Sequence, residues 1–290
     1  MAKNLDIDKY VFDNDQFKKH VDNLVRSSLK LQVVLHQNKV TKEEFLDNLV
    51  KFVDLREYLE NPDNCLFGYE IFRDDEKKLI FKKVPATKKI AELMNIQNNL
   101  WLSDISNINK DLRLGQVSLI SSKQDELEKR MNMIKETFAE HKNISLKGVF
   151  AVNNDVLHSS KLAQALANEF AISNITTVYI KTQDLFKKLR SGFNDGQNQN
   201  AQILSILERA DIVIFDELGN ESANSWFLFE VISQILSKRV VSNKISIFFS
   251  NLSIKQLSNY YENHRTLADE KHKTLTLIQK IQESTIEINF

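Results

Sequence analysis

Two adjacent carboxylates, Asp216 and Glu217, follow directly on the apolar run Ile212 to Phe215. A run of this kind is typical of a strand that is buried on both faces in a parallel sheet. Because ligands of open α/β sheets bind beyond the carboxyl ends of such strands, the two acids suit a Mg²⁺-nucleotide site. One carboxylate would orient the metal and the other a water molecule. Equally, the acids can end the strand and favour the N-terminus of the next helix, and this stretch alone leaves both interpretations open.

The composition limits the classes of protein to which the chain can belong. Lys plus Arg and Asp plus Glu each number 39, so the net charge is zero. Any contact with nucleic acid must therefore come from a local patch. The 6 glycines and 2 prolines favour helix-rich order and argue against a glycine-rich loop. Cys65 is the only cysteine, which excludes a disulfide framework and a zinc site built on a cysteine pair, so no zinc is expected.

The sequence lacks the usual membrane and secretion signals. No apolar run approaches the roughly 18 residues that a spanning helix needs. The charged stretch Met1 to Lys9 is not followed directly by an apolar segment, so no signal peptide is expected. We therefore expect a cytoplasmic protein that does not contact a membrane.

The N-terminal part of the chain predicts a small domain of helices and one hairpin. Apolar residues at helical spacing between positions 9 and 60 predict two or three short helices. Thr41 and Glu44 have the spacing of a capping box for one of them. Phe67 to Phe72 and Leu79 to Val84 flank a polar turn and predict a β-hairpin.

From residue 147 the pattern alternates between strands and helices. Five short apolar segments, separated by stretches of helical spacing, predict a parallel sheet with right-handed crossovers and helices on both faces. These segments are Gly148 to Val152, Thr176 to Ile180, Ile212 to Phe215, Ile245 to Phe249 and Ile286 to Ile288.

These patterns predict how the chain divides. Residues 86–118 are poorly periodic and rich in asparagine, with one short predicted helix around Ile90 to Ile96. We therefore expect an N-terminal domain over 1–100, a linker over 101–120 and an α/β domain over 121–290.

The loop after the first strand departs from the phosphate-binding pattern G-x-x-x-x-G-K-[ST]. In that pattern glycines let backbone N–H groups approach the phosphates, the Lys neutralises charge, and the hydroxyl holds Mg²⁺. The loop here, Asn153 to Ser160, contains no glycine, and Ser159 stands in the position of the Lys. Ser160 suits the hydroxyl position, whereas Asp155 would bring negative charge near phosphate oxygens.

Several segments from Lys147 onward carry a resemblance to a known family. They are Lys147 to Phe150, Ala163 to Glu169, Asp184 to Ser191, Asp216 to Ser222 with Trp226, and Phe248 to Asn251. These segments resemble the ATPase domain of bacterial replicative helicase loaders of the DnaI and DnaC type, within the AAA+ class. The resemblance implies an AAA+-like (P-loop NTPase fold) five-stranded parallel sheet flanked by helices. A small, mostly helical N-terminal domain with a β-hairpin would precede it.

The resemblance also implies roles for individual residues. Asp216 would coordinate Mg²⁺, Glu217 would stand where the family has its catalytic acid, and Asn251 would be the polar sensor. Ser159 and Ser160 would occupy the positions of the phosphate-binding Lys and the metal-binding hydroxyl.

The C-terminal helix departs from the family pattern as well. The family has arginines there that reach a neighbouring subunit's nucleotide, and those positions hold Thr276 and Lys280 here. Lys280 keeps the charge but not the forked geometry of arginine. Because phosphate binding relies on several donors acting together, we expect ATP and Mg²⁺ to bind weakly if at all, without hydrolysis.

Partners are implied in the same way. Members of the family bind the hexameric replicative DNA helicase through the N-terminal domain and help to deliver it onto single-stranded DNA, with ATP as the switch. Lys187, Lys188 and Arg190, with Lys181 nearby, form a candidate DNA-binding patch that could track phosphates. A solvated helix face explains these residues equally well.

Three functions stay open at this point. The first is a helicase-loader-like adaptor in replication initiation with a degenerate nucleotide site. The second is an active AAA+ ATPase loader or a transposition-helper ATPase, and the third is a structural component of a homo-oligomer built on the same fold. Nucleotide affinity separates the first two, and co-purification with a replicative helicase separates the first from the third.

Overall fold

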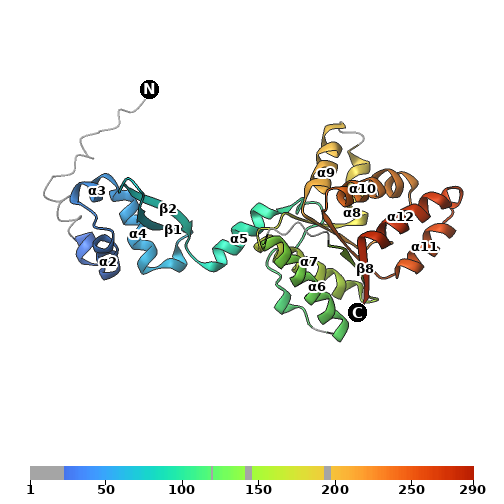
Figure 1. Cartoon of the computed structure of the whole chain (residues 1–290), viewed down its shortest axis with the longest axis horizontal. Helices are drawn as coiled ribbons and strands as arrows, with labels where there is room; N and C mark the ends of the chain where they lie inside the picture. Colours follow the sequence, from blue (N-terminus) through green and yellow to red (C-terminus); the bar gives the residue numbers. More distant parts are fainter. Residues whose placement is uncertain (1–22, 119, 141–145, 193–196) are drawn as a thin grey trace, which may run out of the picture. The chain divides into compact units, whose positions relative to one another are not determined.

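The computed structural model describes residues 23–118, 120–140, 146–192 and 197–290 (Figure 1). Contacts between residues divide the chain into two compact units, one that ends at Glu92 and one that spans Leu93–Phe290. No helix within these described ranges is long and apolar enough to cross a membrane.

The first unit consists of short helices and a two-stranded antiparallel hairpin, as the sequence predicted. The part of the predicted helical region before residue 23 lies outside the described residues. The elements are α2 (Leu29–Gln37), α3 (Lys42–Asp47), α4 (Leu49–Glu60), the 3₁₀ turn η2 (Pro62–Asn64), β1 (Phe67–Arg73) and β2 (Leu79–Pro85).

Aromatic side chains form much of the core of this unit. The ring of Phe52 on α4 stacks on Phe45 with a centroid distance of 4.7 Å and meets Phe81 edge-on at 5.1 Å. Gly68 of β1 lies against Tyr58 of α4 so closely that an added β-carbon would lie 2.5 Å from the ring. A glycine at this position therefore lets the hairpin approach α4.

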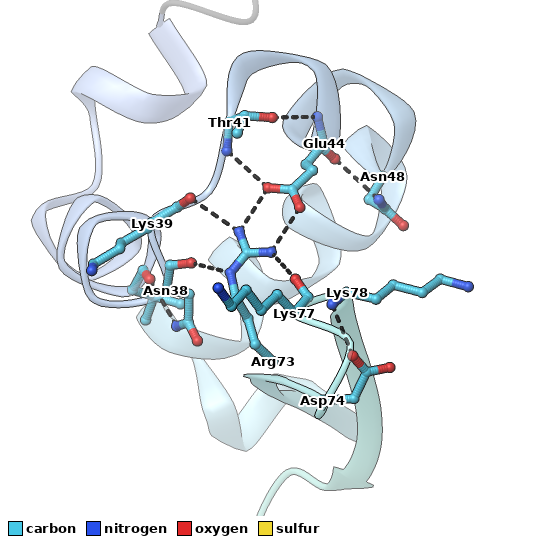
Figure 2. Close-up of polar contacts among 10 residues, drawn as sticks. Asn38, Lys39, Thr41, Glu44, Asn48, Arg73, Asp74, Lys77 and Lys78 are labelled. Atoms are coloured by element: carbon cyan, nitrogen blue, oxygen red, sulfur yellow. Dashed lines mark hydrogen bonds and ion pairs between the residues drawn. The ribbon is translucent and has the colours of Figure 1, made fainter.

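Arg73 at the end of β1 joins the hairpin to the loop between α2 and α3 (Figure 2). Its guanidinium donates to both carboxylate oxygens of Glu44 at 2.8 Å. It also donates to the backbone carbonyls of Asn38, Lys39 and Lys77 at 2.9, 3.0 and 2.6 Å. Glu44 completes the predicted capping box with Thr41 at the start of α3. The hydrogen bond from Arg73 is the main reason why the pKa of Glu44 falls from 4.5 to about 2.

The second unit is built on a six-stranded parallel sheet in the order β3-β5-β6-β7-β4-β8. The five predicted strands are present, and the two-residue strand β3 adds a sixth at the edge beside β5. The strands are β3 (Leu100–Trp101), β4 (Gly148–Val152), β5 (Thr177–Lys181), β6 (Ile212–Asp216), β7 (Ile245–Ser250) and β8 (Thr285–Asn289).

Helices cover both faces of this sheet (Figure 1). On one face lie α5 (Lys88–Asn99), α6 (Ser122–Ala139) and α7 (Val156–Ile172), with the 3₁₀ turn η3 (Leu114–Gln116). On the other lie α8 (Thr182–Ser191), α9 (Gln197–Arg209), the π-helix η4 (Trp226–Ile232), α10 (Ser233–Val241), α11 (Ile254–Asn263), η5 (Ala268–Glu270) and α12 (Lys271–Ser284).

The apolar run of β6 is explained by burial on both faces. Val213 and Phe215 point into the core beneath α8 to α12, whereas Ile212 and Ile214 point into the core beneath α5 to α7. A strand with helices on both sides has no solvent-facing positions, so its sequence shows a continuous apolar run and no alternation. This arrangement confirms the predicted fold class.

The segment that was expected to be a linker packs onto the second unit. Within residues 101–118, Ile108 is buried in the core beneath α5 to α7. The buried Asn168 of α7 donates to the carbonyls of Asn109 and Leu112 at 2.9 and 2.8 Å. One side chain thus satisfies two backbone carbonyls of an irregular segment, an arrangement that produces no periodic pattern in the sequence.

Candidate functional site

The two acids that the sequence singled out lie at the carboxyl end of the sheet. Asp216 is the last residue of β6, which lies between β5 and β7, and Phe215 before it is fully buried, as predicted. Asp216 itself is 1 % exposed. Glu217 follows with a φ of +57°, in the left-handed region that residues other than glycine seldom adopt. Such a conformation is frequent at ligand sites and turns, where surrounding contacts hold it.

Both carboxylate oxygens of Asp216 accept hydrogen bonds from the protein. Oδ2 accepts from Ser160 Oγ at 2.6 Å and from Tyr179 OH at 2.7 Å, and Oδ1 accepts from the backbone N–H of Glu217 at 2.9 Å. Burial raises the pKa of Asp216, against the lowering effect of the two hydroxyl donors. Burial, followed by the charge of Asp216, also raises the pKa of Tyr179. Asp216 is therefore bound by the chain's own hydroxyl and amide groups.

Glu217 directs its carboxylate toward the neighbouring strand β5. Its Oε1 accepts a hydrogen bond from Lys181 Nζ at 2.6 Å and lies 3.3 Å from Ser160 Oγ. Although burial acts to lower it, the hydrogen bond from the ammonium to Glu217 raises the pKa of Lys181. The sequence had grouped Lys181 with the candidate DNA-binding lysines, and the structure instead pairs it with the acidic residue of the site.

The connection after β4 differs from a phosphate-binding loop. Helix α7 begins at Val156, so only three residues, Asn153 to Asp155, separate it from the strand. The carboxylate of Asp155 caps the helix by accepting from the backbone N–H of His158 at 3.0 Å. A helix N-terminus is a ready anion site, and here the protein's own carboxylate lies at that end. Ser159 and Ser160 are buried in the first turns of α7.

The space that is left between these groups is small. A cavity of about 10 Å³ is lined by Asn153, Val156, Ser159, Asp216, Glu217, Asn220, Phe249, Ser250 and Asn251. Three buried polar atoms on its lining have no hydrogen-bond partner: Asn153 Nδ2, Ser159 Oγ and Asn251 Oδ1. A volume of this size holds about one water molecule. The room and the converging N–H donors that a triphosphate needs are not found among the described residues around this cavity.

A second buried carboxylate, Glu221, organises the turn that follows. Its Oε2 accepts from Thr182 Oγ1 at 3.0 Å and from Gly219 N at 2.8 Å, and its Oε1 accepts from Tyr261 OH. Burial and the charge of Glu221 raise the pKa of Tyr261 well above its ordinary range. Gly219 has a φ of +97°, a conformation that suits glycine. A glycine followed two residues later by an acid, Glu221, is the sequence signal by which this turn could have been found.

The other predicted site residues lie elsewhere. Lys280 of α12 donates to Ser233 Oγ at 2.7 Å and to its carbonyl at 3.3 Å, at the junction of η4 and α10. It does not line the cavity at Asp216. Lys187, Lys188 and Arg190 lie on α8, as the helical pattern placed them.

Acidic side chains lie beside the candidate DNA-binding lysines. Lys187 and Lys188 line a groove of about 400 Å³ together with Asp104 and Asp184. These carboxylates offset part of the positive charge that would attract phosphate groups. DNA binding at α8 stays a prediction.

The parallel sheet with helices on both faces and acids beyond its central strand defines an AAA+-like fold of the P-loop NTPase type. Residues 137–275 match the family described as IstB-like ATP binding protein. The replicative helicase loader DnaI of Bacillus subtilis (strain 168) is 22% identical over 135 residues. That match covers 47% of this chain and 43% of the relative, so it spans less than half of either protein.

A solved structure supports the same fold. The crystal structure of DnaI superposes with a TM-score of 0.53 and 23% identity, over 66% of this chain and 95% of that one. The chain therefore carries an IstB/DnaI-like AAA+ domain, which confirms the resemblance stated above.

Proposed function

We propose that this protein is a helicase-loader-like adaptor in the initiation of DNA replication. In this proposal it binds the hexameric replicative helicase through its first unit and assists the loading of that helicase onto single-stranded DNA. The observation that carries the proposal is the similarity of its AAA+ domain to a protein named as a replicative helicase loader. The first unit precedes the AAA+ domain and has a hydrophobic core of its own, which supports a separate role for it in binding the helicase.

The first unit presents an apolar surface that suits a protein partner. Leu46, Val50 and Val53 are exposed at helical spacing along α3 and α4, with Val50 74 % exposed. Leu29 and Val33 are exposed one turn apart on α2. Apolar residues at such spacing on a helix are the usual anchors of helix-mediated recognition. We assign the helicase contact to α3 and α4.

The nucleotide site is proposed to be degenerate. Ser159 is buried without the charge of the family's Lys, the carboxylate of Asp155 caps the helix that would face the phosphates, and the cavity beside Asp216 holds about one water. We expect no ATP hydrolysis and no ATP affinity in the micromolar range. ATP and Mg²⁺ are then not cofactors of the adaptor.

A pull-down with the cell's replicative helicase tests the adaptor. The full-length protein and Glu217→Gln should capture helicase equally, because Glu217 takes no part in the α3–α4 surface. Val50→Glu should lose capture, since it places a charge in an apolar contact. Val240→Glu is the matched control, because Val240 is an exposed valine of the second unit. Failure of the full-length protein to capture helicase would refute the proposal, and equal capture by Val50→Glu would refute the assigned surface.

The alternative function is that of an active AAA+ ATPase, either a loader or a transposition helper. It is favoured by the match to a family described as ATP binding and by the presence of Asp216, Glu217 and Asn251 near one another. Calorimetry decides between the two. Micromolar ATP affinity, or hydrolysis that disappears in Glu217→Gln, would replace the degenerate site with this alternative.

A further inference from the structure

Lys181 and the two carboxylates of the site form one compact charged group. Lys181 is the last residue of β5 and pairs in register with Asp216, the last residue of β6. Its Nζ lies 2.6 Å from Glu217 Oε1, and the two side chains are only 31 % and 18 % exposed. Ser160 Oγ lies between the carboxylates, within 2.6 Å of Asp216 Oδ2 and 3.3 Å of Glu217 Oε1.

Adjacent carboxylates in a partly buried place are stabilised by a positive charge nearby. Two like charges in a medium of low polarity repel strongly, and a cation between or beside them relieves the repulsion. Proteins of this fold commonly place a divalent metal at such oxygens, with substrate phosphates as further ligands. In this chain the positive charge comes from a side chain that the adjoining strand positions.

The neighbouring cavity leaves no room for a hydrated metal. Mg²⁺ usually keeps several of its waters when it binds protein carboxylates, whereas the cavity of about 10 Å³ holds about one water. The unpartnered atoms Asn153 Nδ2 and Ser159 Oγ, on side chains that are each more than nine-tenths buried, line it. Asn153 offers an N–H donor to this space and Asn251 a carbonyl acceptor, a mixed pair that one water molecule satisfies and a bare cation does not.

We propose that the Lys181 ammonium is the resident cation of this site, held where the carboxylates of Asp216 and Glu217 would otherwise take a divalent metal. The proposal deepens the degenerate nucleotide site proposed above and rests on it, but not on helicase binding. It gives Lys181 a positioning role: the ammonium holds the carboxylate of Glu217 against the end of β5.

Removal of the ammonium should convert the site into a metal site. Lys181→Met leaves Glu217 without its partner and removes a repulsive charge, so Mn²⁺ should bind the variant at least about tenfold more tightly than wild type. Electron paramagnetic resonance of free Mn²⁺, without nucleotide, measures this change. Lys187→Met, which removes an exposed lysine of α8, is the control and should behave as wild type. The double variant Lys181→Met, Glu217→Gln should lose the gain.

Two results would overturn the proposal: Lys181→Met that binds Mn²⁺ no more tightly than wild type, or a gain in affinity that persists in the double variant. If Lys181→Met does not fold, the wild-type protein still gives an answer. Its ammonium protons should exchange slowly enough to appear in a ¹⁵N–¹H spectrum, and the signal should vanish in Lys181→Arg, which keeps the charge. Absence of a protected ammonium signal from the wild-type protein would also refute the proposal. Helicase capture is a separate readout, so its failure leaves the metal titration interpretable.

Discussion

Arg239 on α10 is a charged side chain in the interior of the second unit, where it needs several hydrogen-bond acceptors. Its side chain is fully buried, and burial lowers the pKa of its guanidinium. It donates hydrogen bonds at the end of α9 and at the starts of β6 and β7, which it thereby holds together. The acceptors are the carbonyls of Leu207, Ala210, Asp211 and Ile245, and the hydroxyl of Ser246, at distances between 2.5 and 3.3 Å.

Arg239→Met should therefore destabilise the second unit strongly. Three buried carbonyls, those of Leu207, Ala210 and Ile245, would lose this donor, at about 1–3 kcal/mol each, whereas the carbonyl of Asp211 still accepts from the backbone N–H of Ile245. The apolar Met side chain offsets part of this, which leaves a cost of roughly 3 kcal/mol. The free energy of unfolding of a typical protein is only about 5–15 kcal/mol in total. The expected loss is therefore a large fraction of the stability of this unit.

Tryptophan fluorescence during urea unfolding measures this cost in the right place. The 2 tryptophans, Trp101 and Trp226, both belong to the second unit, so the signal reports that unit alone. Arg209→Met is the matched control, because Arg209 is exposed at the end of α9 and surface changes stay within about 0.5 kcal/mol. A loss below about 1 kcal/mol for Arg239→Met, or an equal loss for the control, would refute the reasoning.

Two further predictions concern the first unit, and hydrogen exchange of its backbone amides checks both. Arg73 holds the pKa of Glu44 at about 2 in the folded state, below the ordinary 4.5, so the stability that this pair contributes is present above pH 4.5. It should be lost as the pH falls toward 2, and Arg73→Met should weaken that dependence, with the part that comes from the hydrogen bond of the Thr41 backbone N–H to Glu44 remaining. Gly68→Ala should cost about 1–3 kcal/mol, because its β-carbon would overlap Tyr58. Gly115→Ala in the second unit, with no atom within 4 Å of its β-carbon, is the control and should leave the amide exchange of its own unit unchanged.

The fold could be predicted from periodicity wherever burial leaves a repeating signal. Ile212 to Phe215 is apolar throughout because both of its faces are covered, and the hairpin strands stood out beside their polar turn. Strand β3 has two residues and cannot show a period at all. The helical stretch between β6 and β7 contains the π-helix Trp226–Ile232, whose wider turn leaves no distinct spacing in so short a segment.

Only part of the site could be predicted from the sequence, because its residues come from strands that are neighbours in the sheet but not along the chain. Asp216 and Glu217 stood out because an apolar strand ends at them, and the loop after β4 stood out because glycine is missing. Lys181 also follows an apolar strand directly, and in a parallel sheet the carboxyl ends of neighbouring strands meet at one edge. That rule applied to β5 and β6 together would have placed Lys181 beside Asp216. Its sequence neighbours on α8 drew it into a basic patch instead, because proximity along the chain is visible in a sequence and strand order is not.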